Sequence, residues 1–161
     1  DRISNFFKDQ GYAALDIEAV LAIDSGLICE IPKRLNAIKE FSQLPESKDL
    51  ASANKRVGNI LKKADFKSAL KVDPTLLKDI AEVNLHQALD LVDAEARKEY
   101  LTNNYSGSLK LLCKLKNPID QFFNDVMVNV DDESLKMNRL ALLEKLYSAM
   151  NLVADLSKLS S

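Results

Sequence analysis

Apolar residues recur along most of the chain at the three- and four-residue spacing of amphipathic helices, and this pattern predicts an all-α protein. In the segment that follows Pro32, for example, Leu35, Ile38 and Phe41 fall on one side of a helix. Runs that alternate apolar and polar residues are scarce, and hairpin turns containing glycine are absent from the sequence. In chain order we expect helices at about 2–10, 15–23, 32–44, 46–64, 75–103, 108–116, 117–123 and 132–159.

Short connections between these helices indicate that neighbours pack antiparallel. The chain has 161 residues, a length typical of one domain, and it contains no internal repeat or low-complexity stretch. We therefore predict that residues 1–161 form a single antiparallel helical bundle. The longest apolar runs are only a few residues long, so we expect no membrane span. Because the first residue is Asp1, we also expect the chain to be a piece of a longer protein.

The residues that carry most enzyme chemistry are few and isolated in this chain. Structural zinc requires four Cys or His ligands, whereas the chain has only Cys29, His86 and Cys113. No glycine-rich loop of a phosphate-binding type occurs. His86 faces away from the apolar line of its predicted helix, so we expect it to be exposed, with no carboxylate fixed beside it. We expect unpaired thiols, no metal, no resident cofactor and no catalysis by this chain alone.

The net charge of −2 conceals a basic segment in the first half of the chain. Residues 31–72 carry ten basic and four acidic side chains, whereas acids outnumber bases on both sides of this segment. The electric field at a protein surface follows the charge within a Debye length, about 8–10 Å, so such a segment can bind a polyanion despite the acidic total. The same composition is also typical of a plain solvated helix face, and both interpretations stay open.

The predicted helix at 46–64 separates apolar and basic residues onto opposite sides. Its apolar residues fall within about one third of the circumference. That apolar side consists of Leu50, Ala53, Val57, Ile60, Leu61 and Ala64. The opposite side carries Lys48, Lys55, Asn59, Lys62 and Lys63, with Arg56 beside them. This composition suits RNA, because cations bind phosphates and an amide can both donate to and accept from base edges.

One charged residue, Arg139, interrupts the apolar stripe of the last predicted helix. A guanidinium in that place must either be paired in the interior or emerge at a functional surface. Asp125 is an available acid, and a buried pair between Arg139 and Asp125 would join two helices. A contact with an RNA phosphate or base is the alternative.

Three sequence elements together resemble a known family. The first is the segment FFNDVMVNVDDESLKMNRLALLEKL at 122–146, followed by Asp-Leu-Ser at 155–157. The second is the Asn-Lys-Arg-x-x-Asn-Ile-Leu element at 54–61, and the third is the Arg-Leu-x-Ala-x-x-x-Phe pattern at 34–41. Together they resemble the C-terminal region of the β subunit of bacterial heterotetrameric glycyl-tRNA synthetases.

The resemblance implies a helical anticodon-binding domain similar to the one that ends the class I arginyl-tRNA synthetases. It implies that the partner is glycine tRNA, whose last two anticodon bases are cytosines, and that the complex is a cytoplasmic α2β2 assembly. In that family the α subunit uses ATP and magnesium to activate glycine, while the β subunit supplies most tRNA contacts. Neither DNA nor a membrane is an implied partner.

The resemblance also implies a set of RNA-binding residues. Those in the matching elements are Asn54, Lys55, Arg56 and Asn59, with Lys62 and Lys63 on the same basic side and Arg34, Asn138 and Arg139 elsewhere. Asn54 has a second interpretation, a buried hydrogen bond between helices. Exposed aromatics are scarce, so base stacking would fall to Tyr105, Tyr147 or an arginine plane. The competing hypothesis from another class is a helical protein-interaction module whose basic side meets an acidic partner.

Overall fold

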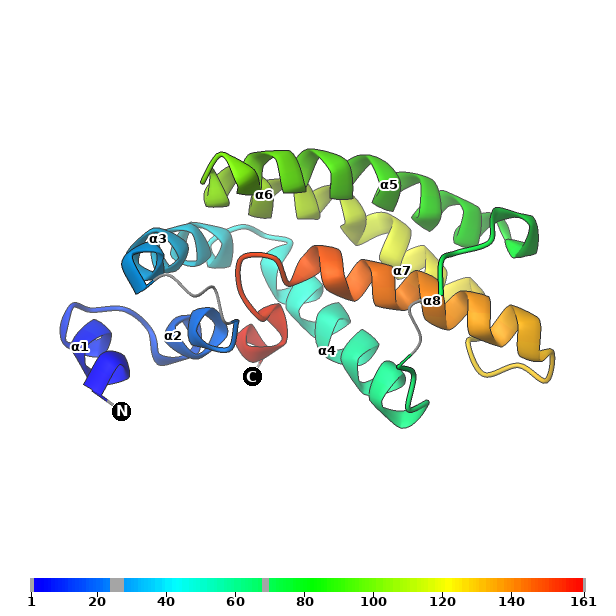
Figure 1. Ribbon diagram of the computed structural model, residues 1–161, viewed down its shortest axis with the longest axis horizontal. Coiled ribbons are helices and arrows are strands. Elements are labelled where there is room, and N and C mark those ends of the chain that lie inside the picture. The colour runs from blue at the N-terminus through cyan, green and yellow to red at the C-terminus, as the bar shows by residue number, and fades with distance from the viewer. Residues whose placement is uncertain (1, 24–27, 68–69, 161) are drawn as a thin grey trace.

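The computed structural model describes residues 2–23, 28–67 and 70–160, and every regular element in them is a helix (Figure 1). The predicted all-α class is confirmed. In chain order the elements are α1 (Arg2–Asp9), α2 (Ala14–Leu21), the 3₁₀ turn η1 (Ile28–Glu30), α3 (Ile31–Ser42), α4 (Ser47–Lys63), η2 (Pro74–Leu76), α5 (Ile80–Leu101), α6 (Tyr105–Leu112), η3 (Cys113–Leu115), α7 (Lys116–Asp125), α8 (Glu133–Met150) and η4 (Leu156–Leu159).

The two longest predicted helices, at 75–103 and 132–159, are much shorter in the structure. The long helix begins at Ile80, because the Glu82 carboxylate accepts the backbone N–H groups of Lys78 and Asp79 and closes the helix there. The last helix ends at Met150, and residues 156–159 form the separate element η4. The Asp155 carboxylate, which accepts the Ser157 backbone N–H at 3.0 Å, begins this second element.

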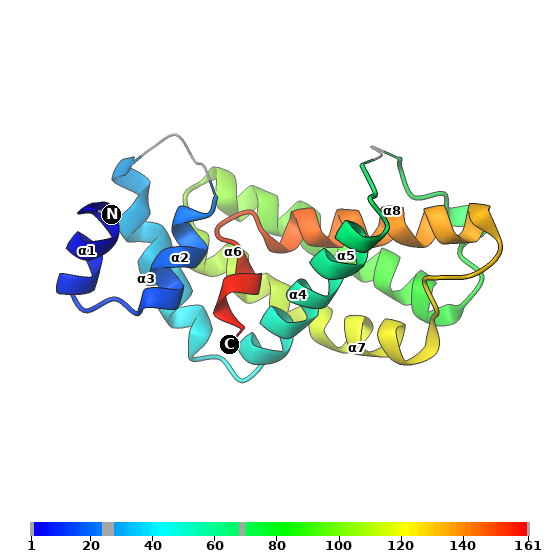
Figure 2. The ribbon, with the colours of Figure 1, turned by 90° about the horizontal axis from the view of Figure 1, so that it is seen from below.

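The helices fall into two groups joined by α4. Helices α1–α3 lie at one end of the molecule, and α5–α8 extend along the rest of it, with α6 and α7 running opposite to α5 and α8 (Figure 1). Helix α4 crosses α8 diagonally, and the C-terminal element η4 folds back against both α4 and α2 (Figure 2). Segments from the two ends of the chain therefore pack together.

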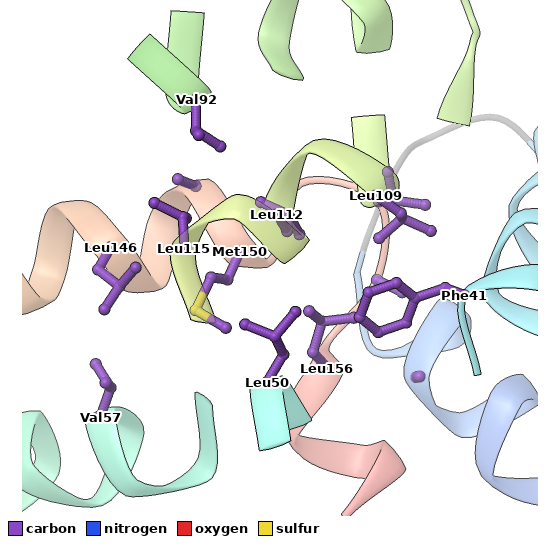
Figure 3. Close-up of a cluster of buried hydrophobic side chains, with 14 of the residues drawn as sticks. Phe41, Leu50, Val57, Val92, Leu109, Leu112, Leu115, Leu146, Met150 and Leu156 are labelled. Carbon is purple, nitrogen blue, oxygen red and sulfur yellow. The ribbon is translucent and has the colours of Figure 1, made fainter. Parts of the chain in front are cut away.

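One continuous apolar core runs through both groups of helices. Where α4 meets the rest of the protein, Leu50 and Val57 lie close to Leu146 and Met150 of α8 and to Leu156 of η4 (Figure 3). Each of these five side chains is almost completely removed from solvent. We call this contact of five side chains the seam. Burial of side chains of this size contributes roughly 1.5–3 kcal/mol each to stability, so the seam fixes which side of α4 faces inward.

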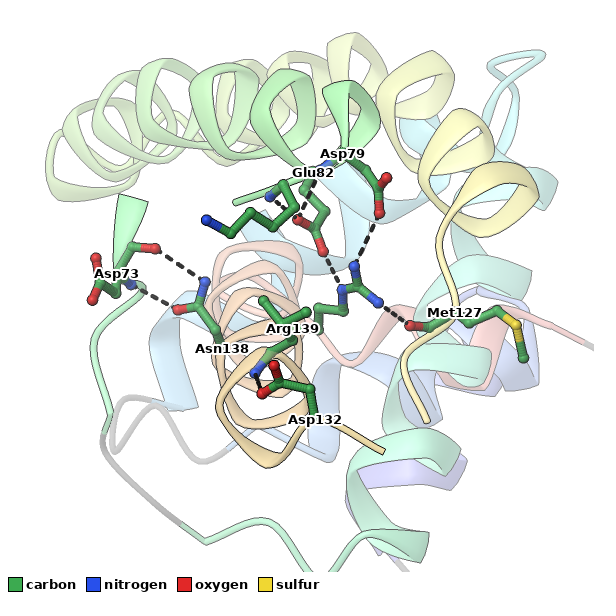
Figure 4. A network of polar contacts seen from close by, with 9 residues as sticks. Asp73, Asp79, Glu82, Met127, Asp132, Asn138 and Arg139 are labelled. Atoms are coloured by element: carbon green, nitrogen blue, oxygen red, sulfur yellow. Dashed lines mark hydrogen bonds and ion pairs between the residues drawn. The ribbon is translucent and has the colours of Figure 1, made fainter. Parts of the chain in front are cut away.

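A polar cluster at the other end of α8 links three elements around Arg139 (Figure 4). The Arg139 Nε donates to the buried Glu82 carboxylate of α5, and its Nη2 lies 2.9 Å from the Asp79 carboxylate. Its Nη1 donates to the Met127 carbonyl at 2.6 Å, in the loop that joins α7 to α8. The predicted pairing of Arg139 with Asp125 is wrong. Asp125 is exposed at the end of α7, and the guanidinium binds the carboxylates of Asp79 and Glu82 instead.

We expect Arg139→Met to lower the free energy of unfolding by about 3–5 kcal/mol, because it leaves the Glu82 carboxylate buried without its cation. Lys145→Met is the matched control. Lys145 also joins α8 to α5, through Asp90, but its side chain is 34% exposed, so we expect a loss below about 1 kcal/mol. Urea unfolding of the parent and both variants measures the difference. Equal unfolding free energies for the parent and Arg139→Met would contradict the structural role.

Candidate nucleic-acid interface

Helix α4 positions the candidate interface by burying its opposite side. Leu50, Asn54 and Val57 face the core, so the side chains one third of a turn or more away from them must face solvent. Gly58 lets α4 approach α8 closely, since a Cβ at this position would lie 3.1 Å from the Tyr147 ring. The helix is therefore seated firmly along one side and open along the other.

The open side of α4 forms a groove of about 730 Å³, which we name the basic groove. It is lined by Ser52, Lys55, Arg56, Asn59, Ile60, Lys62, Lys63 and Ser160. All four cations and Asn59 are exposed. The structure thus brings together the five α4 residues that the sequence placed on the basic side and assigned to RNA, and it adds two serines.

The positive charge of the basic groove is not neutralised by nearby acids. The two acids that flank the groove cations along the chain have other partners: Asp49 lies 3.4 Å from Lys116, and Asp65 lies 3.3 Å from Lys67. Hydrogen bonds from Lys116 to Asp120 and then to Asp49 raise the pKa of that ammonium group. Within the part of the chain that the structure describes, no ion pair involves a groove cation. Four cations on one open face are a favourable arrangement for a polyanion.

Arg56 differs from the other groove cations in its support. Its guanidinium lies over the Phe123 ring of α7, with its central carbon 4.1 Å from the ring centroid. Stacking on the ring restricts the guanidinium plane while its N–H groups stay at the surface. This arrangement suits both an RNA phosphate and the face of a base.

Burial contradicts the RNA contact predicted for Arg34. Its side chain is enclosed between the rings of Tyr100 and Tyr105, and it donates to the Val153 carbonyl at 3.0 Å and to the Tyr100 hydroxyl at 2.9 Å. This residue joins α3, α5 and the segment after α8. The arginine of the pattern at 34–41 therefore has a structural role in this protein.

The two predicted amides, Asn54 and Asn138, are also internal. Asn54 is fully buried and donates to Asn151 at 3.1 Å, which ties α4 to the end of α8. Asn138 pairs with both backbone groups of Asp73, at 2.7 and 3.0 Å, and so anchors the segment before α5 (Figure 4). Of the two interpretations of Asn54, the structure supports the hydrogen bond between helices. The RNA contact predicted for Arg139 is wrong for the same reason, because carboxylates in the interior bind its guanidinium.

The aromatic residues expected to stack on bases are partly unavailable. Tyr105 is buried and hydrogen-bonded to Glu30 at 3.1 Å; burial and then this bond raise the pKa of its hydroxyl. The Tyr147 ring packs against α4 at Gly58. Burial, and to a smaller extent the charge of Asp155, raises the pKa of the Tyr147 hydroxyl. The Phe123 ring, by contrast, is only partly buried and supports Arg56. The arginine plane is thus the stacking element at the basic groove.

His86 does not occupy the position predicted for it. Its side chain is only 16% exposed, and its Nε2 lies 3.7 Å from the Asp90 carboxylate. The predicted orientation of this helix is wrong, because Leu85 and Leu89 face the core whereas Leu91 is exposed. Apolar residues surround much of α5, so the sequence pattern alone could not fix its orientation.

A comparison with known protein families decides the classification. Residues 50–156, about two thirds of the chain, match the family described as the DALR anticodon binding domain. The chain belongs to this family. The matched range begins in α4 and ends at the first residue of η4, so it contains the basic groove except Ser160, together with the apolar contact between α4 and α8 that supports the groove.

Curated relatives cover the whole of this DALR-containing chain. It is 50% identical to the "Glycine--tRNA ligase beta subunit" of Methylobacillus flagellatus, 50% identical to that of Dechloromonas aromatica and 46% identical to that of Nitrosomonas europaea. In each case the similarity extends over all 161 residues of this chain. The chain spans 22–23% of the length of these relatives.

Sequence reasoning missed three residues at the interface. Ser52 shares the side of α4 that carries Lys55 and Asn59, so the helical spacing could have found it. Ser160 reaches the basic groove from the other end of the chain, and Phe123 carries Arg56 from α7. No local pattern signals either of these long-range contacts.

Two further observations limit the chemistry of the described residues. Among residues 2–23, 28–67 and 70–160, no three Cys, His, Asp or Glu side chains converge in a way that could hold a metal ion. None of the described helices has both the length and the apolar character needed to cross a membrane.

The two amides of α4 provide a test of this division into buried and exposed residues. We expect Asn54→Ala to lower the free energy of unfolding by about 1–3 kcal/mol, since Asn54 is fully buried and the variant loses both its hydrogen bond to Asn151 and its packing between the helices. The control Asn59→Ala, on the exposed side, should change it by no more than about 0.5 kcal/mol. Denaturant unfolding measures both, and similar losses for the two variants would contradict the assignment.

Proposed function

We propose that this chain binds the anticodon arm of glycine tRNA, as the anticodon-binding part of a glycine–tRNA ligase β subunit. The observation that carries the proposal is the basic groove, in which four cations and one amide lie open on a single helix face. Membership of the DALR anticodon binding domain family and the names of the relatives support it.

In this proposal the lysines of the basic groove bind phosphates, and Arg56 and Asn59 contact unpaired bases. Lys55, Lys62 and Lys63 carry mobile point charges, which suit a flexible phosphate backbone. Asn59 and Arg56 present donors, and Asn59 also presents an acceptor, to base edges. A cytosine offers an amino donor and ring acceptors on its pairing edge, so such side chains can recognise the two cytosines of a glycine anticodon.

The proposal assigns no bond-making step to this chain. In the assembly that we propose, a cytoplasmic α2β2 complex, the α subunit activates glycine with ATP and magnesium. The remainder of the β subunit would complete the tRNA-binding surface. This chain then contributes affinity and selectivity for the tRNA.

Salt dependence tests the phosphate contacts directly. In the full-length protein that contains this chain, we expect the double variant Lys55→Gln, Lys62→Gln to weaken binding of glycine tRNA and to reduce the slope of log affinity against log salt by roughly two, because each phosphate contact contributes about one. Titrations at several salt concentrations measure the slope. Lys98→Gln with Lys110→Gln, exposed lysines of α5 and α6 outside the groove, is the matched control and should leave the slope unchanged.

Charge reversal separates this proposal from a protein-interaction module. With Lys55→Glu and Lys62→Glu, the RNA proposal requires weaker tRNA binding and charging while the subunits still assemble. Weakened assembly with unchanged tRNA charging would contradict the RNA proposal and favour an acidic protein partner.

A further inference from the structure

A second pocket adjoins the basic groove and shares Arg56, Ile60 and Lys63 with it. Its volume is about 500 Å³, within the range of small-ligand sites. The apolar part of its lining includes Phe123 of α7, Val126 of the following loop and Leu140 of α8, and its basic part consists of Arg56, Lys63 and Lys136. We name it the side pocket.

The composition of the side pocket fits a nucleobase better than a phosphate or a peptide carboxylate alone. A base has two apolar faces and a polar edge, and in RNA it carries a phosphate on each side. The side pocket offers the corresponding surfaces: apolar side chains inside, cations outside and the amide of Asn129 in its lining. None of the described lining residues is acidic, so nothing in the pocket repels the phosphates.

Arg56 and Lys63 line both the basic groove and the side pocket. A strand whose phosphates follow the groove would therefore pass beside the side pocket. The guanidinium of Arg56 already lies over the Phe123 ring, with its central carbon 4.1 Å from the ring centroid, so the two side chains form a surface for stacking before any base binds.

The wall of the side pocket is fixed by the interior of the protein. Met127 lines the pocket, and its carbonyl accepts the Arg139 Nη1 hydrogen bond at 2.6 Å (Figure 4). The Arg139 guanidinium is in turn bound to Asp79 and Glu82 of α5. This buried arginine thus positions the loop between α7 and α8, and a prepared wall reduces the ordering cost of binding.

From these contacts we propose that the side pocket receives one unpaired base of the bound RNA, stacked against the Arg56–Phe123 pair. The inference rests on the proposed function, because it places the base next to phosphates held in the basic groove. It goes further by dividing the interface into a phosphate track on α4 and a base site between α4, α7 and α8.

A cycle of protein and RNA changes tests the proposal in the full-length protein. The probe is an RNA hairpin with the anticodon loop of glycine tRNA, and in a matched series each loop base in turn is replaced by an abasic nucleotide. We expect Arg56→Lys, which keeps the charge, and Phe123→Leu, which keeps an apolar side chain, each to weaken binding of the intact hairpin roughly five- to 140-fold. On the hairpin that lacks the base bound in the side pocket, most of this loss of affinity should disappear.

Phe6→Leu is the matched control, because Phe6 is an exposed aromatic residue of α1, far along the chain from the pocket, and it should change neither hairpin's affinity. The salt slope of Arg56→Lys should equal that of the parent. Equal penalties on the intact and on every abasic hairpin, with a normal salt slope, would overturn the base site and leave the proposed function standing. Absence of salt-dependent binding by the parent would instead overturn the proposed function itself.

Discussion

The seating of α4 against α8 and η4 is the constraint on which the candidate interface depends. Leu50 and Val57 are buried in this seam, so the helix cannot rotate without exposing them to water. Asn54 adds a directional contact, its hydrogen bond to Asn151, which apolar packing alone cannot provide. The cations on the other side of α4 are therefore open to solvent because of what the helix buries, and their common orientation is a consequence of packing.

Two arginines in the interior give the fold its polar connections. Arg34 joins α3 to the tyrosines of α5 and α6 and to the Val153 carbonyl, while Arg139 joins α8 to α5 and to the loop after α7. Each links elements distant in sequence, and each satisfies several partners at once through the planar guanidinium. In the arrangement that we propose, Arg139 acts on RNA only through the backbone of that loop.

The sequence predicted the helical class and the basic side of α4 because both follow from local spacing. Lys55 and Asn59 lie four residues apart, and any regular helix places them together. The roles of Arg34 and Asn138 could not be predicted in this way. A polar side chain in a functional motif looks the same whether it binds RNA or a distant backbone carbonyl, and only the tertiary contacts distinguish the two. For the same reason Phe123 was missed as the support of Arg56.

The return of the C-terminal segment to α4 has a consequence for synthesis of the chain. Asn54 and Asn151, which hydrogen-bond across the seam, are 97 positions apart. At about 5–20 residues per second, the ribosome needs roughly 5–20 s to add the residues between them. For most of that interval α8 has not been synthesised, and η4 follows only after α8, so the apolar side of α4 lacks both partners. The proposed RNA-binding geometry is therefore complete only after η4 has been synthesised, and a nascent chain interrupted before η4 would carry the charges without the orientation that makes them a site.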